Sequence, residues 1–175
     1  MRIVAGLVRG RRLTVPEGTT TRPTTDRVRE ATFNSLFSLD LIEGRTFCDL
    51  FAGSGALGLE ALSRGAAHVT FVERDRQALA ALSANIESLD FGDQATVVTA
   101  DAMRWIATAG RFDVVLADPP YGFDAWIELV GLVDCELLVA ESGTTLDEPV
   151  SALTLRERTY GSTVVTFLDP QGEST

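Results

Sequence analysis

The feature that most constrains this chain is the regular alternation of short apolar runs with helical segments between residues 46 and 141. Five runs rich in β-branched and aromatic residues predict buried strands at residues 46–51, 68–73, 96–100, 112–117 and 136–141. Helical spacing of apolar residues predicts helices at residues 57–64, 75–89, 102–108 and 125–132. Alternating β and α units require a parallel sheet with right-handed crossovers. We therefore expect an α/β fold with helices on both faces of the sheet.

Both ends of the chain depart from this alternation. Residues 152–159 and 162–169 are joined by a short turn, Tyr160-Gly161, with no helix between them. They predict an antiparallel hairpin at one sheet edge. Alternating runs within residues 2–15 predict a second β-hairpin at the N-terminus.

A helix is expected from about Asp26 to Leu39, with Thr24, Thr25 and Asp26 as N-cap candidates. We divide the chain into a basic hairpin extension (residues 1–22), a main domain (residues 23–170) and a disordered tail (residues 171–175).

Composition narrows the class of protein. An apolar fraction of 45% in 175 residues fits one globular domain. No run approaches a membrane span, and no secretory signal is recognisable, so a cytoplasmic protein is expected. Cys48 and Cys135 fall in predicted buried strands and are expected to be reduced core thiols. No metal site is expected.

Charge is distributed unevenly along the chain. The net charge is −10, yet residues 1–30 hold seven arginines against three carboxylates, a balance of +4, and the remainder carries −14. A basic arm on an acidic body is typical of a protein that docks a polyanion at one end. Arg9, Arg11 and Arg12 cluster near the tip of the expected hairpin. These arginines could contact RNA phosphates, or they could simply lie in a solvated hairpin turn.

A glycine-rich loop follows the first strand of the alternation. Gly53, Gly55 and Gly58 match G-x-G-x-x-G and open a helix, and Glu73 ends the next strand twenty residues after Gly53. In this context the pattern predicts a nucleotide site, with phosphate or carboxylate favoured at the helix N-terminus. Glu73 could accept from both hydroxyls of a ribose. A dinucleotide and S-adenosylmethionine both fit.

Two further carboxylates bear on that choice. Asp49 interrupts an otherwise apolar strand and, as a buried carboxylate, needs a partner. It could face the cationic amine of S-adenosylmethionine, a role that a pyrophosphate does not offer. Asp101 follows the third strand, where it could accept from an adenine amino group or cap the helix that begins at Ala102.

Asp118-Pro119-Pro120-Tyr121 follows the fourth strand of the alternation. Two prolines fix φ and supply no N–H, so a rigid turn is expected at the carboxyl end of the strand, where ligands bind in open α/β sheets. The turn presents a carboxylate, a carbonyl without a competing partner and an aromatic face. This set is suited to a flat ring that bears an amine.

Together these motifs resemble class I S-adenosylmethionine-dependent methyltransferases that modify exocyclic amines. The stretches at residues 2–11, 22–30 and 158–161 are similar to the RsmD family of 16S ribosomal RNA guanine-N2 methyltransferases. The resemblance implies a Rossmann-like, seven-stranded, mostly parallel sheet with an antiparallel C-terminal strand. It implies S-adenosylmethionine as the cofactor, with Phe51, Ala52 and Ala102 among the residues that bind it. The loop at residues 22–24 would close over the cofactor or simply lead into the helix.

The expected reaction is direct methyl transfer. Asp118 and the Pro119 carbonyl would accept from the two N–H groups of a guanine amine, Pro120 would keep the turn rigid and Tyr121 would stack on the base. No covalent enzyme intermediate is expected, because no cysteine is placed for one. The expected partner is 16S ribosomal RNA or an assembling small ribosomal subunit, and the expected state is a monomer.

Three alternatives remain open on the residues alone. One is a methyltransferase of the same class that acts on adenine N6, in DNA or RNA, or on a protein glutamine. The second is a nicotinamide-dependent oxidoreductase, which would leave Asp118 and Tyr121 without a role. The third is a non-catalytic RNA-binding module that retains the fold.

Overall fold

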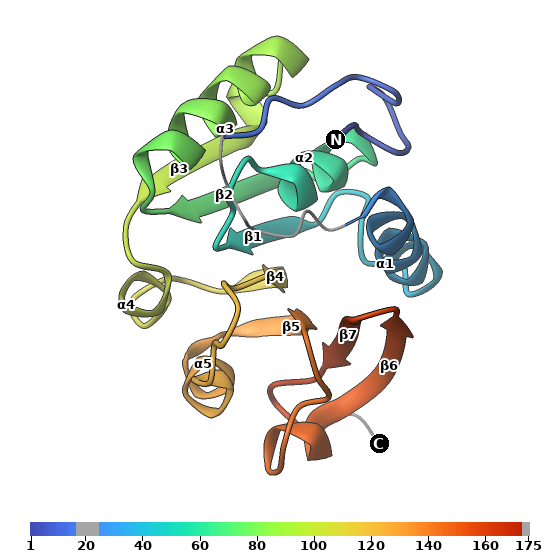
Figure 1. Ribbon diagram of the computed structural model, residues 1–175, viewed down its shortest axis with the longest axis vertical. Helices are drawn as coiled ribbons and strands as arrows, with labels where there is room; N and C mark the ends of the chain where they lie inside the picture. The colour runs from blue at the N-terminus through green and yellow to red at the C-terminus, as the bar shows by residue number, and fades with distance from the viewer. Residues whose placement is uncertain (17–24, 173–175) are drawn as a thin grey trace.

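The computed structural model describes residues 1–16 and 25–172 and contains one seven-stranded sheet in the order β3-β2-β1-β4-β5-β7-β6 (Figure 1). Its strands are β1 (Thr46–Leu50), β2 (His68–Glu73), β3 (Ala95–Thr99), β4 (Phe112–Ala117), β5 (Cys135–Ser142), β6 (Thr154–Tyr160) and β7 (Thr163–Leu168). Its helices are α1 (Asp26–Ser38), α2 (Ala56–Ser63), α3 (Arg76–Leu89), α4 (Ala102–Ile106) and α5 (Trp126–Leu132), with 3-10 turns η1 (Gly92–Gln94) and η2 (Val150–Leu153).

The sheet has the predicted topology. Strands β1 to β5 pair in parallel, and β7 runs antiparallel to both of its neighbours, β5 and β6. The seven-stranded, mostly parallel sheet with an antiparallel C-terminal strand is therefore confirmed. Element ends differ from the predicted ones by at most two residues. The two-residue shifts are at the end of α4, which is Ile106 rather than residue 108, and at the start of β6, which is Thr154 rather than residue 152.

Two separate cores lie on the two faces of the sheet. Alternation along β1 sends Phe47 toward α1, α2 and α3, and sends Cys48 and Leu50 toward α4 and α5. Figure 1 shows the two groups of helices on opposite faces. Cys48 and Cys135 are buried free thiols, as predicted, and burial raises the pKa of Cys135 to about 12.

The N-terminal arm, residues 1–16, makes much less β-structure than predicted. The expected hairpin is present but short, with one antiparallel bridge between Arg2 and Arg12 and three backbone hydrogen bonds that join residues 1–3 to residues 10–13. Instead of extending a ladder, the arm lies along α2 and α3 and buries Ile3 and Leu13 in the core. The Asn85 side chain of α3 makes two hydrogen bonds with the backbone of Thr14. Its Oδ1 accepts from the Thr14 N–H at 2.8 Å, and its Nδ2 donates to the Thr14 carbonyl at 2.9 Å. Side-chain contacts thus fix the arm to the helices beyond its short backbone pairing.

Glu60 of α2 anchors the start of this arm. Its carboxylate is fully buried and accepts from the amides of Val4 (2.8 Å) and Ala5 (3.0 Å). Arg29 of α1, also fully buried, lies 3.5 Å from it, and Arg64 donates to it at 2.8 Å. Arg29 therefore belongs to the interior and contributes nothing to the basic surface expected of residues 1–30.

Some predictions lie outside the described residues. These are the loop at residues 22–24, the boundary between residues 22 and 23, and residues 173–175 of the predicted tail. The helix start is visible, because the Thr25 side chain caps α1 by accepting from the Val28 amide at 3.3 Å. Within the described ranges, no helix has the length and apolarity needed to cross a bilayer.

Glu60→Ala should lower the free energy of unfolding by about 3–5 kcal/mol, because it leaves two arm amides without their acceptor and removes one of the two carboxylates, Glu60 and Asp26, that pair with the buried Arg29. Urea denaturation would measure this. Glu136→Ala is the matched control, since it removes one partner of a solvent-accessible pair with Arg45 and should cost at most about 1 kcal/mol. Equal losses in the two variants would contradict this account of the arm.

Candidate active site

The predicted site residues meet where β1, β2 and β4 end. Leu50, the last residue of β1, lies beside Val72 of β2 and Ala117 of β4. Glu73 and Asp118, the next residues on those two strands, therefore reach the same edge of the sheet. The strand order reverses between β1 and β4, and ligands bind at such a point in open α/β sheets.

The three glycines of the loop after β1 have different tasks. A Cβ on Gly58 would lie 2.3 Å from the Phe71 ring, and one on Gly55 would lie 2.4 Å from Leu82, so these two allow α2 to pack closely. Gly53 has φ +56, and a Cβ there would meet nothing within 4 Å. The backbone at Gly53 is thus open to close approach by a ligand.

Glu73 is held by the backbone around it. Its Oε2 accepts from the Gly53 amide at 2.8 Å, and its Oε1 accepts from the amides of Arg74 (2.7 Å) and Asp75 (2.8 Å). A carboxylate has about four acceptor positions. One position, on Oε2, is left for a ligand, which suits one ribose hydroxyl rather than the two that were predicted.

Asp49 has a partner that the sequence did not reveal. Its side chain is buried, and its Oδ2 accepts from the Gly58 amide in the first turn of α2 at 2.8 Å. Burial raises the pKa of Asp49 well above its usual value, the Gly58 bond lowers it, and nearby Asp118 and Glu73 raise it further. Three carboxylates thus act on one small region, which favours a cationic ligand group there.

Asp101 caps a helix, one of the two roles considered for it. Its Oδ1 accepts from the Arg104 amide at 3.2 Å, at the start of α4, and Ala102 beside it is buried. Its Oδ2 accepts from Arg74 at 2.9 Å. The contact with adenine stays a prediction, and it would share Oδ2 with Arg74.

The Asp118-Tyr121 segment forms the predicted turn. Phe123 donates its N–H to the Pro120 carbonyl at 3.2 Å, and Gly122 has φ +79, so the chain reverses directly after the prolines. The Tyr121 side chain is 70% exposed. Among the described residues, none donates a hydrogen bond to the Pro119 carbonyl, which leaves it available as an acceptor.

Three aromatic side chains connect this turn to the glycine loop. The Phe123 ring lies 5.4 Å from Phe51 at 67° and 4.9 Å from Trp126 at 84°. Phe51 has φ +61, in the left-handed region that a bulky residue rarely adopts. Phe123 and Trp126 were not predicted from the sequence. The only signal was an aromatic residue two positions after Tyr121, which also fits an ordinary core contact.

The arginines assigned to RNA lie away from this edge. Arg11 donates to the Ser88 carbonyl at 2.6 Å, in the last turn of α3. Helix α3 begins three residues after Glu73 and is about 20 Å long, so Arg11 lies at the far end of that helix. Arg9 and Arg12 are exposed. The structure does not bring these three arginines to the predicted catalytic residues.

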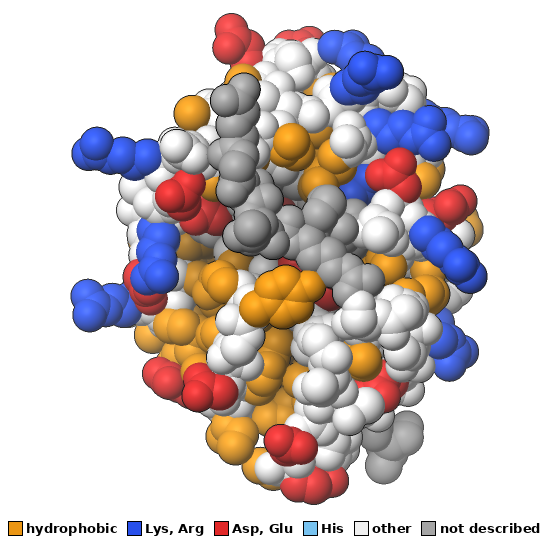
Figure 2. Space-filling model, viewed as in Figure 1, with side chains coloured by type: hydrophobic (Ala, Val, Ile, Leu, Met, Phe, Trp, Pro, Cys, Tyr) orange, Lys and Arg blue, Asp and Glu red, His pale blue; other side chains and the backbone are white. Residues whose placement is uncertain are grey.

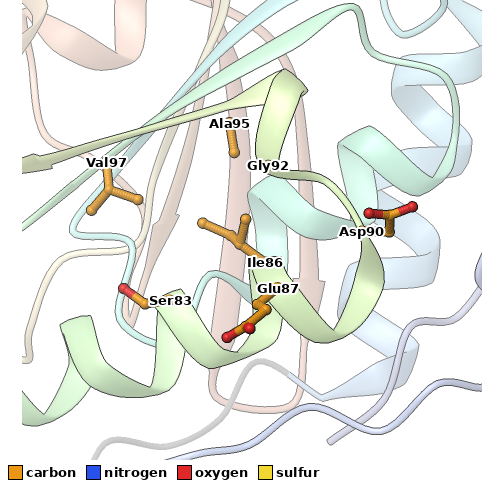
Figure 3. A pocket seen from close by; sticks show the side chains of 7 residues that line it. All are labelled: Ser83, Ile86, Glu87, Asp90, Gly92, Ala95 and Val97. Carbon is orange, nitrogen blue, oxygen red and sulfur yellow. The ribbon is translucent and has the colours of Figure 1, made fainter.

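The described surface also has a groove outside the predicted site. It has a volume of about 360 Å³ and lies between α3 and the edge strand β3 (Figure 3). Its lining residues are Ser83, Ile86, Glu87, Asp90, Gly92, Ala95 and Val97, none of which was predicted to bind a ligand. No group of three or more His, Cys, Asp or Glu residues in the described ranges could hold a metal ion.

Comparison with known proteins identifies the family. The family described as Conserved hypothetical protein 95 matches residues 1–169. The chain belongs to this family. It is 44% identical to ribosomal RNA small subunit methyltransferase D of Escherichia coli (strain K12) over 135 residues, which cover 77% of this chain and 67% of the relative. It is 37% identical to the putative rRNA methyltransferase YlbH of Bacillus subtilis (strain 168) over 98% of this chain and 100% of the relative. The resemblance to the RsmD family is therefore confirmed.

Solved structures place the fold among the class I methyltransferases. The structure of the putative methyltransferase yhhF from Escherichia coli superposes with a TM-score of 0.83 at 39% identity and 97% coverage of both chains. A 16S rRNA N2 G1207 methyltransferase from Thermus thermophilus, solved with AdoMet and guanosine, shares the fold, with a TM-score of 0.69 at 21% identity. The superposed region covers 87% of this chain and 44% of the Thermus thermophilus chain.

Asp49→Asn should stabilise the protein increasingly as pH rises. A raised pKa in the folded state means that the folded form binds more protons than the unfolded form, so stability falls as pH rises above the ordinary aspartate value. The amide oxygen of asparagine can still accept from Gly58 without carrying the charge. Thermal melts from pH 5 to pH 8 should show a melting temperature advantage that grows with pH. A constant advantage, or a loss at pH 8, would contradict the assignment.

Proposed function

We propose that this protein transfers a methyl group from S-adenosylmethionine to the exocyclic N2 of a guanine in 16S ribosomal RNA. The observation that carries the proposal is the convergence of the glycine loop, Glu73 and the Asp118-Tyr121 turn at one edge of the sheet. The family adds weight, since its named members include ribosomal RNA small subunit methyltransferase D.

The residues at this edge fit S-adenosylmethionine. Gly53 leaves room for close approach, and Glu73 keeps one acceptor position for a ribose hydroxyl. Asp49, Glu73 and Asp118 together favour the positive charge of a sulfonium or an amine. When bound, S-adenosylmethionine supplies an electrophilic methyl group attached to sulfur. Phe51, Ala52, Asp101 and Ala102 would complete the site around the adenosine.

The Asp118-Tyr121 turn would prepare the acceptor nitrogen. The lone pair of a guanine amine is delocalised into the ring, which makes the amine a poor nucleophile. Hydrogen bonds from its two N–H groups to the Asp118 carboxylate and the Pro119 carbonyl favour a pyramidal nitrogen with its lone pair directed at the methyl. The same acceptors would stabilise the positive charge that develops on nitrogen as the N–C bond forms and the S–C bond breaks with its electron pair going to sulfur. The methylated nitrogen would then lose one proton to solvent and become neutral. Pro120 holds the turn rigid, so little reorganisation is needed.

Tyr121 would hold the base. Its exposed ring offers a stacking surface worth about 1–3 kcal/mol for one base. The target guanine must leave its own stack to reach the turn.

Arg9 and Arg12 would contact RNA phosphates distant from the target base. Figure 2 shows arginine side chains along the margins of the viewed face, most of them in its upper half, and acidic side chains in both halves. Arg11 already donates to the end of α3, and its contribution to RNA binding should be smaller. We further propose that the protein acts as a monomer in the cytoplasm, as expected from the sequence.

Mapping the modified base tests the proposed function directly. The protein would be incubated with S-adenosylmethionine and either 16S ribosomal RNA or small subunits that lack the modification, and nuclease digests would be read by mass spectrometry. N2-methylguanosine at a single position is expected. Methyl groups found on adenine N6, or on protein instead of RNA, would contradict the proposal.

Asp118→Ala should lower kcat about 10²–10³-fold, the loss typical when one acceptor or donor for transition-state charge is removed. Affinity for S-adenosylmethionine, measured by calorimetry, should fall far less than kcat, because Asp49, Glu73 and the glycine loop remain. Asp113→Ala is the control, because Asp113 is a carboxylate near the opposite end of the same strand, bonded to Thr46. A large loss of cofactor affinity with kcat retained would contradict the role of Asp118.

Replacing Arg9 and Arg12 together by alanine should weaken RNA binding and reduce the slope of log K against log salt by about 1.4–1.8, at about 0.7–0.9 per phosphate contact. S-adenosylmethionine affinity should not change. Arg111→Ala, which removes an exposed arginine paired with Asp134, is the matched control and should leave the slope unaltered. An unaltered slope in the double variant would exclude the arm from the RNA interface.

A further inference from the structure

The sheet anchors the start of the Asp118-Tyr121 turn. The turn starts at Ala117, a buried residue paired with Leu50 of β1 and Ala140 of β5. Two prolines make the segment stiff, but stiffness alone does not set where its far end lies relative to the glycine loop. Phe123 is the next side chain along the chain that packs against a core.

Phe123 contacts both sides of the proposed site. Its amide donates to the Pro120 carbonyl and closes the turn, and its ring contacts the rings of both Phe51 and Trp126. Both ring pairs have edge-to-face geometry, which aromatic rings prefer and which fixes orientation as well as distance. Figure 2 shows that hydrophobic side chains gather on the lower left of the viewed face, over the region of α4 and α5.

Each neighbour of Phe123 is itself anchored. Phe51 directly follows β1 and directly precedes the glycine loop, with its backbone in the left-handed region. Trp126 begins α5, and Leu129 of that helix is fully buried in the second core. The three rings therefore connect the cofactor loop, the catalytic turn and a helix on the same face of the sheet.

We propose that Phe123 is a positioning residue that sets the Asp118-Tyr121 turn against the glycine loop, so that the acceptor amine and the donor methyl meet in line. The inference rests on the proposed methyl transfer. In-line transfer needs the reacting atoms close together and aligned, and a misplacement of about 1 Å can cost 10²-fold in rate. A mutation at Phe123 should therefore act on turnover more than on either binding step.

The test compares Phe123→Leu with Phe112→Leu. Phe112 is also a half-buried phenylalanine packed against the second core, with one aromatic neighbour, Trp105, at 6.2 Å, but it lies at the opposite end of β4 from the turn. Phe123→Leu should lower kcat about 10–100-fold and leave the KM and Kd for S-adenosylmethionine within about threefold. Phe123→Tyr, which retains the ring, should restore most of the rate. Phe112→Leu should lose melting temperature to a similar degree and keep its kcat.

Three results would overturn the inference. They are equal kcat values in the two leucine variants, no recovery with tyrosine, and a rise in the Kd for S-adenosylmethionine that accounts for the lost activity. The last would make Phe123 part of the cofactor-binding wall.

Hydrogen exchange supplies a readout that does not depend on methyl transfer. The Phe123 amide, bonded to the Pro120 carbonyl, should exchange at least about tenfold faster in Phe123→Leu than in the wild type, and should be unaffected by Phe112→Leu. Unchanged protection would overturn the inference even if the wild type methylated another substrate. A wild type without activity on ribosomal RNA, with the exchange result as expected, would refute the proposed function and leave the positioning role of Phe123 supported.

Discussion

The pairing of β1 with β4 is the constraint on which the site depends. These strands are far apart in sequence, and Leu50 lies beside Ala117 only because the strand order reverses between them. That register brings the glycine loop after β1 next to the turn after β4. A shift of one residue would send each side chain of the moved strand to the opposite face and separate the proposed cofactor and acceptor sites.

Backbone amides hold the carboxylates of this edge in place. Glu73 accepts hydrogen bonds from three backbone amides, and Asp49 accepts one from the Gly58 amide inside the core. Asp101 caps α4 by accepting from the Arg104 amide. Held in this way, acidic groups can lie close together without basic side chains neutralising all of them. Desolvation of Asp49 and its repulsion by Asp118 and Glu73 oppose folding, and a bound cation would relieve both. The edge is therefore less stable than a neutral one and better suited to a sulfonium ligand.

The sequence predicted what depends on local pattern and motif. The strand–helix alternation determined the sheet, and the glycine loop, Glu73 and the Asp118-Tyr121 turn were placed at the correct edge because parallel strands share it. It could not predict Arg29 as an interior residue, since its burial depends on Glu60, thirty-one positions later. The N-terminal hairpin is shorter than predicted, because alternation does not reveal that Glu60 and Asn85 bind the backbone of Val4, Ala5 and Thr14. The packing of Phe123 against Phe51 and Trp126 likewise depends on tertiary contacts, which residue spacing in the sequence does not reveal.

A crystal structure with S-adenosylmethionine, or with a non-reactive analogue, and guanosine would test the central claim most directly. The account predicts a ribose hydroxyl on Glu73 Oε2, the sulfonium close to Asp49 and Asp118, and the guanine N2 bonded to Asp118 and the Pro119 carbonyl. The transferable methyl should point at that nitrogen, at about 3–3.5 Å. A ligand bound elsewhere, for example in the groove between α3 and β3, or a guanine that presents another atom to the methyl, would contradict the account.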